Sequence, residues 1–163
     1  GKGCLGTEVG RLANAVGMKV LYAEHKDATV CREGYTPFEE VLRQADIVTL
    51  HCPLTETTKN LINAETLSKM KKGAFLINTG RGPLIDELAL VDALKTGHLG
   101  GAALDVMVKE PPEKDNSLIL AAKTMPNLII TPHIAWASDS AVTTLVGKVM
   151  QNIEEFVQQL NQK

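Results

Sequence analysis

The sequence predicts an α/β fold built on a doubly wound parallel sheet. Short apolar runs typical of buried strands alternate with stretches of helical periodicity along most of the 163 residues. A glycine-rich segment opens the chain and leads directly into the first helical stretch. Charged or titratable residues follow several of the apolar runs, and the carboxyl ends of parallel strands meet at one edge of a sheet. Together these observations predict a ligand-binding α/β domain.

The opening segment fits the dinucleotide-binding pattern G-x-G-x-x-G with Gly1, Gly3 and Gly6. Glycines at these positions allow a tight turn and a close approach of the backbone to a pyrophosphate. Apolar residues at helical spacing follow, and Gly17 is expected to end that helix. The amides and the dipole at the start of the helix would face the phosphates, as in a Rossmann-type domain.

A strand-like run at 19–23 ends at Glu24, close to the spacing of about 20 residues at which this pattern places an acid. Such a carboxylate would bind the adenosine ribose hydroxyls and repel the extra phosphate of NADP, so Glu24 predicts NAD as the cofactor. His25 and Lys26 leave an alternative open, because neighbouring cations could tolerate a phosphate.

The rest of the chain continues the alternation. Thr36 to Glu39 predicts a capping box with proline at the first helical position, opening a helix that ends near Gln44. Further helices are expected at 63–70, from a cap at Asp86 to near Gly97, and over 138–160, and a proline-rich loop is expected between the last two strands. Five strands are expected, at 19–23, 47–50, 74–78, 101–106 and 128–131.

No strand precedes Gly1, although a dinucleotide-binding motif normally follows one. In the common order 3-2-1-4-5-6 that first strand lies in the middle of the sheet. We therefore expect a fragment of a longer chain, lacking its first strand, with its sheet split. The expected divisions are a dinucleotide-binding domain over 1–137 and a C-terminal helix over 138–163.

Composition restricts the class of protein. With 44% hydrophobic and 22% charged residues the chain has ordinary globular composition, and a net charge of −2 gives no electrostatic reason to expect nucleic acid or an anionic membrane as partner. No apolar run approaches the roughly 20 residues that span a bilayer. The three cysteines lack metal-ligand spacing, so no metal site is expected. They suit a reducing, cytoplasmic compartment, and small buried or half-buried hydrophobes are the simpler interpretation.

Arg81, Glu110 and His133 each follow a strand-like run, and side chains in such positions can converge on one small molecule. This order indicates a catalytic constellation. Taken singly, each has a simpler explanation: Arg81 could cap a turn, Glu110 could be a solvated loop acid, and His133 could be a loop histidine held by the neighbouring proline.

Four further motifs occur in the order LHCPLTETTKNLIN, LINTGRGPLIDE, ALDVMVKEPP and TPHIAWAS. With the glycine pattern they resemble the D-2-hydroxyacid dehydrogenase family, and the stretches VLYAEHK, LDVMVKEPPEKDN and HIAWAS are most similar to its glycerate dehydrogenase or hydroxypyruvate reductase branch. The resemblance implies NAD-dependent interconversion of a small 2-keto acid and a D-2-hydroxy acid. Hydroxypyruvate or glyoxylate would be the keto acid and D-glycerate or glycolate the product, in a homodimer.

The resemblance also implies roles for single residues. Arg81 matches the arginine that binds the substrate carboxylate, His133 the general acid and Glu110 its carboxylate partner. Asp105 could be a simple strand-end cap, but its LDV context favours a contact with the nicotinamide carboxamide. Trp136 could border the substrate pocket, although packing is the commoner role of such an aromatic residue, and it is left outside the catalytic set. The cofactor contacts implied are Cys4 and Leu5 at the pyrophosphate, Glu24 at the ribose, Cys52, Pro53 and Thr58 at the adenosine, and Thr79, Gly80 and Asp105 at the nicotinamide end, beside Arg81 and His133.

In the resembling family the chain returns after the histidine loop to a substrate domain, which is otherwise built from upstream residues. The helix over 138–163 is expected to pack on that domain, so here its apolar stripe would be partly exposed or meet another chain. This fragment alone could be inactive. A second hypothesis is an NAD-sensing regulatory or scaffold protein on the same fold, without turnover.

Overall fold

The computed structural model describes residues 1–161. The chain forms two compact units, one comprising residues 1–132 and one beginning at His133. The first unit holds a parallel sheet with its helices, and the second consists of a turn and one long helix. The α/β fold with a parallel sheet, predicted from the sequence, is confirmed.

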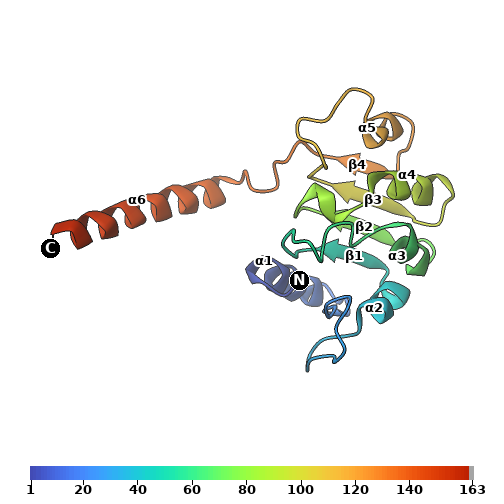
Figure 1. Cartoon of the computed structure of the whole chain (residues 1–163), viewed down its shortest axis with the longest axis horizontal. Coiled ribbons are helices and arrows are strands. Elements are labelled where there is room, and N and C mark those ends of the chain that lie inside the picture. Colours follow the sequence, from blue (N-terminus) through green and yellow to red (C-terminus); the bar gives the residue numbers. More distant parts are fainter. Residues whose placement is uncertain (162–163) are drawn as a thin grey trace. The chain divides into compact units, whose positions relative to one another are not determined.

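The sheet contains four strands in the order in which they occur along the chain, all parallel (Figure 1). Their last residues lie in register, so that Leu50 pairs with Asn78, Asn78 with Leu104, and Leu104 with Ile130. The segments that follow the strands therefore start from one straight edge. The strands are β1 (Ile47–Leu50), β2 (Phe75–Asn78), β3 (Gly101–Leu104) and β4 (Leu128–Ile130).

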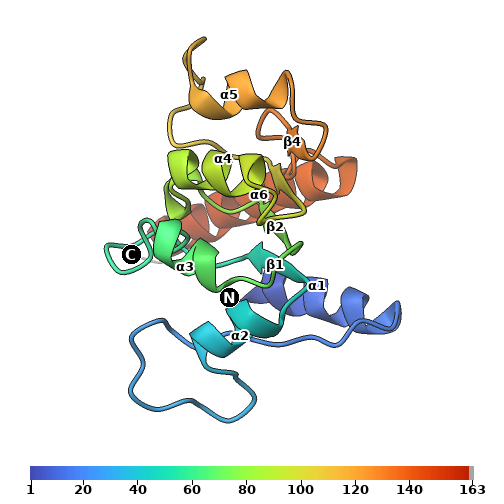
Figure 2. The same cartoon turned by 90° about the vertical axis from the view of Figure 1, so that its right-hand side faces the viewer.

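A row of four helices covers one face of this sheet (Figures 1 and 2). Neighbouring helices of the row pack against each other. The buried side chains beneath them form one apolar core, to which β2 contributes Leu76 and α4 contributes Leu90. On the opposite face Ile47, Phe75 and Ile129 are exposed. The helices are α2 (Phe38–Gln44), α3 (Ala64–Lys69), α4 (Glu87–Lys95) and α5 (Ser117–Ala122).

Side chains fix the starts of three of these helices. Asn63 and Thr66 form a reciprocal capping box at α3, and Asp86 accepts from two backbone amides at the start of α4. Asn116 does the same for α5, a helix that lies in the segment where we expected only a proline-rich loop. That expectation was wrong because an effective cap lets a short apolar run form a helix between two loops.

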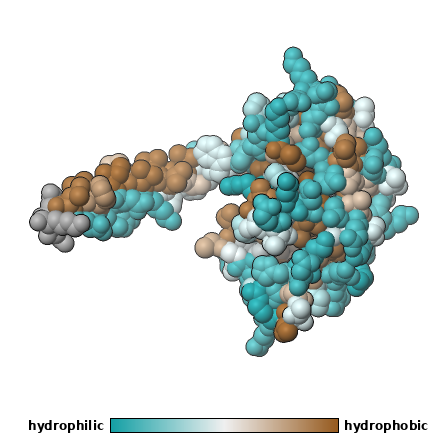
Figure 3. Space-filling view, in the orientation of Figure 1, coloured by the Kyte–Doolittle hydropathy of each residue, from teal (hydrophilic) through white to brown (hydrophobic). Residues whose placement is uncertain are grey.

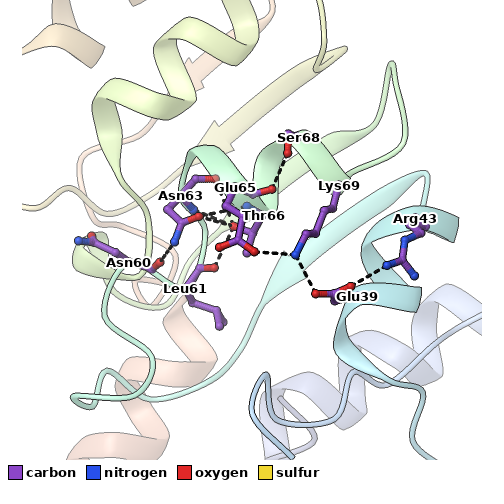
Figure 4. A network of polar contacts seen from close by, with 9 residues as sticks. All are labelled: Glu39, Arg43, Asn60, Leu61, Asn63, Glu65, Thr66, Ser68 and Lys69. Atoms are coloured by element: carbon purple, nitrogen blue, oxygen red, sulfur yellow. Dashed lines mark hydrogen bonds and ion pairs between the residues drawn. The ribbon is translucent and has the colours of Figure 1, made fainter.

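Salt bridges connect α2 to α3 at the surface (Figure 4). Lys69 donates to Glu39 at 2.7 Å and to Glu65 at 2.6 Å, and Arg43 donates to the other oxygen of Glu39 at 2.6 Å. Exposed pairs of this kind each contribute about 0–1 kcal/mol. They therefore set the alignment of the two helices more than the stability of the fold, which depends on the apolar core.

The expected strand at 19–23 does not join the sheet. Its only ladder contact within the described residues is an isolated bridge between Ala23 and Thr36. There the Thr36 amide donates to the Tyr22 carbonyl, and the Thr36 carbonyl accepts from the Glu24 amide, both at 2.8 Å. A strand needs a neighbour that takes up its backbone groups, and here one residue does so.

The same bridge explains a second wrong prediction, the capping box at Thr36. The N-cap of α2 is Pro37, and no side chain caps this helix. Thr36 uses its backbone amide and carbonyl in the bridge. The helix therefore begins one residue later than predicted, and Pro37 takes the N-cap position.

The helix predicted after the glycine motif is confirmed as α1 (Cys4–Ala15), and Gly17 follows it with a φ of 86°. Gly10 lies in close contact with the 20–22 segment, since a Cβ built on Gly10 would lie 2.2 Å from the Tyr22 hydroxyl. Close packing at this glycine holds α1 against the residues that lead to Glu24.

The second unit contains α6 (Asp139–Asn161). Its apolar stripe is exposed, as the hydrophobic band along this helix in Figure 3 shows. No helix in residues 1–161 is both long and apolar enough to cross a membrane. The exposed side chains of the stripe are Val142, Leu145, Val149, Ile153, Phe156, Val157 and Leu160.

The core beneath the helix row gives a stability prediction. Leu76 is 0% exposed at the centre of β2, whereas Leu88 on α4 is 68% exposed. We expect Leu76→Ala to lower the free energy of unfolding by about 2–5 kcal/mol, because it leaves a cavity in a packed core. Leu88→Ala is the matched control and should change it by less than about 0.5 kcal/mol. Urea titration of both variants measures the difference, and equal losses would contradict this description of the core.

Candidate functional site

The edge formed by the carboxyl ends of the strands carries the segments singled out by the sequence. Hydrogen bonds extend the ladder one residue past the strands, from the Asp105 amide to the Asn78 carbonyl and from the Thr131 amide to the Leu104 carbonyl, both at 2.9 Å. The Thr131 hydroxyl also donates to the Asp105 carboxylate at 2.5 Å. Asp105 is therefore a buried group that joins the ends of two strands.

The glycine motif meets this edge beside β1. A Cβ built on Gly1 would lie 2.3 Å from the His51 carbonyl oxygen, and one built on Gly6 would lie 2.0 Å from that of Gly1. Both glycines are thus required by backbone packing. Gly3 differs, because a Cβ built there has no atom within 4 Å. The space beside Gly3 is open, so a ligand can approach the backbone there.

The start of α1 suits an anion electrostatically. Gly3 is its N-cap, no side chain caps the helix, and its first turn contains no acidic residue. The first amides of a helix have no partner within the helix, and the helix dipole favours negative charge there. The backbone at Cys4 and Leu5, predicted as a pyrophosphate contact, lies at this position.

The loop after β1 is held by threonine hydroxyls. Thr58 donates its hydroxyl to the Pro53 carbonyl at 2.7 Å and accepts from the Thr55 amide at 2.8 Å.

Cys52 is half-buried and packs against the core, as expected for a small hydrophobe, but Cys4 and Cys31 are exposed, which contradicts that interpretation for them.

The loop that carries Arg81 is shaped by Asn78, which the sequence analysis missed. Asn78 is 0% exposed at the end of β2. Its side-chain oxygen accepts from the Gly80 amide at 3.0 Å, and its side-chain nitrogen donates to the Arg81 carbonyl at 2.9 Å. The Arg81 side chain is exposed and donates to the Gly80 carbonyl at 2.7 Å. The sequence did contain a sign of this role, because Asn78 is a polar residue on the buried face of the apolar run FLIN.

The structure brings the Arg81 and Glu110 segments together. A Cβ built on Gly82 would lie 2.0 Å from the carbonyl carbon and oxygen of Met107, so the two backbones are in direct contact. The Met107 amide donates to the Glu110 carboxylate at 2.9 Å. Arg81 and Glu110 thus extend from two loops that touch. Their joint action with His133 stays a prediction.

Glu87 is a second residue that the sequence analysis missed. One of its carboxylate oxygens accepts from the Val108 amide and the other from the Asn116 side chain, both at 2.8 Å. Glu87 stands at the start of α4, so it connects that helix to both ends of the loop that contains Glu110. In the sequence, Glu87 is the acidic residue at the end of the motif LINTGRGPLIDE. Nothing in the sequence pointed to its partners, Val108 and Asn116.

His133 begins the second unit, with a positive φ of 53°. Its carbonyl accepts from the indole nitrogen of Trp136 at 2.8 Å. Trp136 therefore fixes the turn around the histidine through a hydrogen bond, while its ring is exposed. This is a local structural role.

Glu24 is almost completely buried and forms a two-pronged ion pair. The Nε and Nη2 atoms of Arg32 donate to its two carboxylate oxygens at 2.7 and 2.5 Å, and the amides of His25 and Arg32 donate at 2.8 and 3.1 Å. These bonds, led by that from the Arg32 side chain, lower the pKa of Glu24 from 4.5 to about 2. The carboxylate is charged at neutral pH.

Comparison with known proteins identifies this arrangement. The family profile described as "D-isomer specific 2-hydroxyacid dehydrogenase, NAD binding domain" matches residues 1–135. The chain belongs to this family. It is an NAD-binding domain of the D-isomer specific 2-hydroxyacid dehydrogenases, and the open cradle at Gly3 before α1 fits the pyrophosphate of that cofactor.

Relatives of this dehydrogenase domain have been described in several bacteria. A provisionally named 2-hydroxyacid dehydrogenase of Haemophilus influenzae is 97% identical over the whole chain, which covers 52% of that protein. A glycerate dehydrogenase of Methylorubrum extorquens is 48% identical over 96% of the chain and 48% of its own length. The NAD-complexed D-isomer specific 2-hydroxyacid dehydrogenase of Lactobacillus delbrueckii aligns with a TM-score of 0.86 at 32% identity, covering 97% of this chain and 52% of that one. The chain spans about half the length of these relatives.

The Glu24–Arg32 pair predicts a dependence of stability on pH. A carboxyl group whose pKa is lowered on folding contributes stability above its unfolded pKa, here 4.5, and the contribution is lost as the pH falls towards its folded pKa of about 2. The gap in unfolding free energy between the wild type and Glu24→Gln should therefore be constant above about pH 5 and shrink between pH 4.5 and 2. Denaturant titrations across this range measure the gap. Glu56→Gln, in an exposed loop, is the control, and a gap that does not change with pH would contradict the prediction.

Proposed function

We propose that the protein containing this domain is an NAD-dependent oxidoreductase that interconverts a 2-keto acid and a D-2-hydroxy acid. The observation that carries the proposal is the direct contact between the Arg81 and Glu110 loops. This contact lies at the same sheet edge as the glycine motif of Gly1, Gly3 and Gly6. We propose hydroxypyruvate or glyoxylate as the keto acid. The similarity to a glycerate dehydrogenase supports this choice, since oxidation of D-glycerate gives hydroxypyruvate.

In the proposed mechanism Arg81 binds the substrate carboxylate. A guanidinium presents a planar fork of donors that matches a carboxylate in two-point geometry, and its charge also polarises the adjacent carbonyl. The exposed position of Arg81, on a loop held by Asn78, leaves its donors accessible to a small anion. When bound, the nicotinamide cofactor supplies the hydride that is added to the carbonyl carbon.

His133 is proposed as the acid that donates a proton to the carbonyl oxygen during reduction and removes it during oxidation. Glu110 is proposed to stabilise the protonated imidazole. Thr79, Gly80 and Asp105 are proposed contacts at the nicotinamide end, and Cys52, Pro53 and Thr58 at the adenosine. Hydride and proton together convert the 2-carbonyl group of the substrate into an alcohol.

The proposal extends to the assembled protein. Residues 1–137 would form the cofactor domain, and α6 would pack on a substrate domain through its exposed apolar stripe. The last two positions of the helix predicted over 138–163 lie outside the described residues. The family likeness supports a homodimer, and three free thiols suit the reducing cytoplasm.

Turnover by the whole protein tests this function. NADH oxidation is followed with hydroxypyruvate, glyoxylate and pyruvate in parallel, and we expect the highest kcat/KM with hydroxypyruvate. NADH binding without turnover on any of these acids would overturn the proposed reaction and favour a regulatory NAD-binding protein. A preference for pyruvate would overturn the proposed substrate alone.

Arg81→Gln tests the substrate-binding residue. Loss of two charge-assisted hydrogen bonds should lower kcat/KM at least about 100-fold, while the dissociation constant for NADH stays within about threefold. Arg43→Gln, which removes an exposed arginine on α2, is the matched control and should keep wild-type kinetics. Steady-state assays with NADH-binding titrations measure both values, and unchanged kcat/KM for Arg81→Gln would remove it from the mechanism.

A further inference from the structure

The hydrogen bonding of Glu24 conflicts with the role usually given to an acid at its position. A carboxylate has about four lone-pair sites on its two oxygens. In Glu24 each oxygen already accepts two hydrogen bonds, one from the Arg32 side chain and one from a backbone amide. The side chain is also only 3% exposed. Glu24 therefore has no acceptor left for a ribose hydroxyl while Arg32 stays in place.

Arg32 is the member of the pair that a ligand would meet. Its side chain is 53% exposed, and the pair with Glu24 uses two of the five N–H donors of the guanidinium. The guanidinium carbon also lies 4.2 Å from the centroid of the Tyr35 ring, and this stacking holds its plane. The accessible group at this point of the site is thus a fixed cation.

A second cation lies at the same aromatic ring. The ammonium of Lys2, within the glycine motif, is 5.2 Å from the Tyr35 centroid and 4.8 Å from that of Tyr22. Tyr35 therefore links the motif that is suited to the pyrophosphate with the arginine that covers the acid. His25 and Lys26, both exposed, follow Glu24 directly. Lys2 and Arg32 thus lie at one aromatic ring, and the buried acid beside them is paired, although the exposed acids Asp27 and Glu33 belong to the same segment.

We propose that this domain binds NADPH as well as NADH, with Arg32 as the residue that accepts the 2′-phosphate. An unpaired acid selects NAD by binding the ribose hydroxyls and repelling that phosphate, whereas an arginine nearby accommodates it. Here the arginine pairs with the acid, removes its free acceptors and offers its own donors instead. The inference deepens the cofactor side of the proposed function, on which it rests, and does not depend on turnover.

Direct binding tests the inference without a keto acid. Dissociation constants of the whole protein for NADH and NADPH are measured by nucleotide fluorescence, and we expect them to agree within tenfold. Arg32→Gln should raise the ratio of the NADPH constant to the NADH constant at least tenfold. Arg11→Gln is the matched control, because Arg11 is also an exposed arginine in a two-pronged pair, here with the exposed Glu8, and it should leave the ratio unchanged.

A wild-type measurement keeps the test valid if Arg32→Gln does not fold. Adenosine 2′,5′-bisphosphate should displace bound NADH at least as well as 5′-AMP does. Wild-type discrimination against NADPH of more than tenfold, weaker displacement by the bisphosphate, or a smaller shift in folded Arg32→Gln would each overturn the inference. Failure to bind either nucleotide would overturn it together with the proposed function, whereas NADH-dependent turnover with exclusion of NADPH would overturn it alone.

Discussion

The in-register ends of four parallel strands are the constraint on which the site depends. The last residues of the strands form one row across the sheet, so every following loop starts at the same edge. These residues are Leu50, Asn78, Leu104 and Ile130. Loops that begin from one straight edge come into contact after very few residues. The touching of the Arg81 and Glu110 loops through Gly82 is a consequence of that alignment, and catalysis by several side chains requires such fixed geometry.

Three polar side chains, the buried Asn78 and Asp105 and the half-buried Glu87, hold the loops at this edge in place. Asn78, Glu87 and Asp105 each use hydrogen bonds to connect the end of a strand or the start of a helix with a neighbouring loop. A buried polar group left without a partner costs about 1–3 kcal/mol, so each of these side chains disfavours any loop conformation that breaks its bonds. The apolar core stabilises the fold, and the hydrogen bonds of these three side chains fix the positions of the loops.

The elements with strong local signals were predictable from the sequence. The four sheet strands, α1, the helix at 63–70 and the cap at Asp86 follow from periodicity and capping chemistry within a few residues. The segment at 19–23 was not, because strand formation depends on a neighbour distant in sequence. For the site, residue types and the common edge could be predicted, but Glu87 to Val108 and Glu24 to Arg32 are pairings that only the fold reveals. The roles of Arg81, Glu110 and His133 rest on family resemblance and stay predictions.

Gly3 and Gly82 illustrate two different reasons for a residue to be fixed. Added atoms at Gly3 would enter open space that a nucleotide needs, whereas at Gly82 they would collide with the backbone of Met107. The first restriction exists only while a ligand is bound, and the second exists whenever the chain is folded. In a related domain that no longer binds a nucleotide, a larger residue could therefore replace Gly3 without a clash. Gly82 would still be required there, because the folded backbone leaves no room for a side chain.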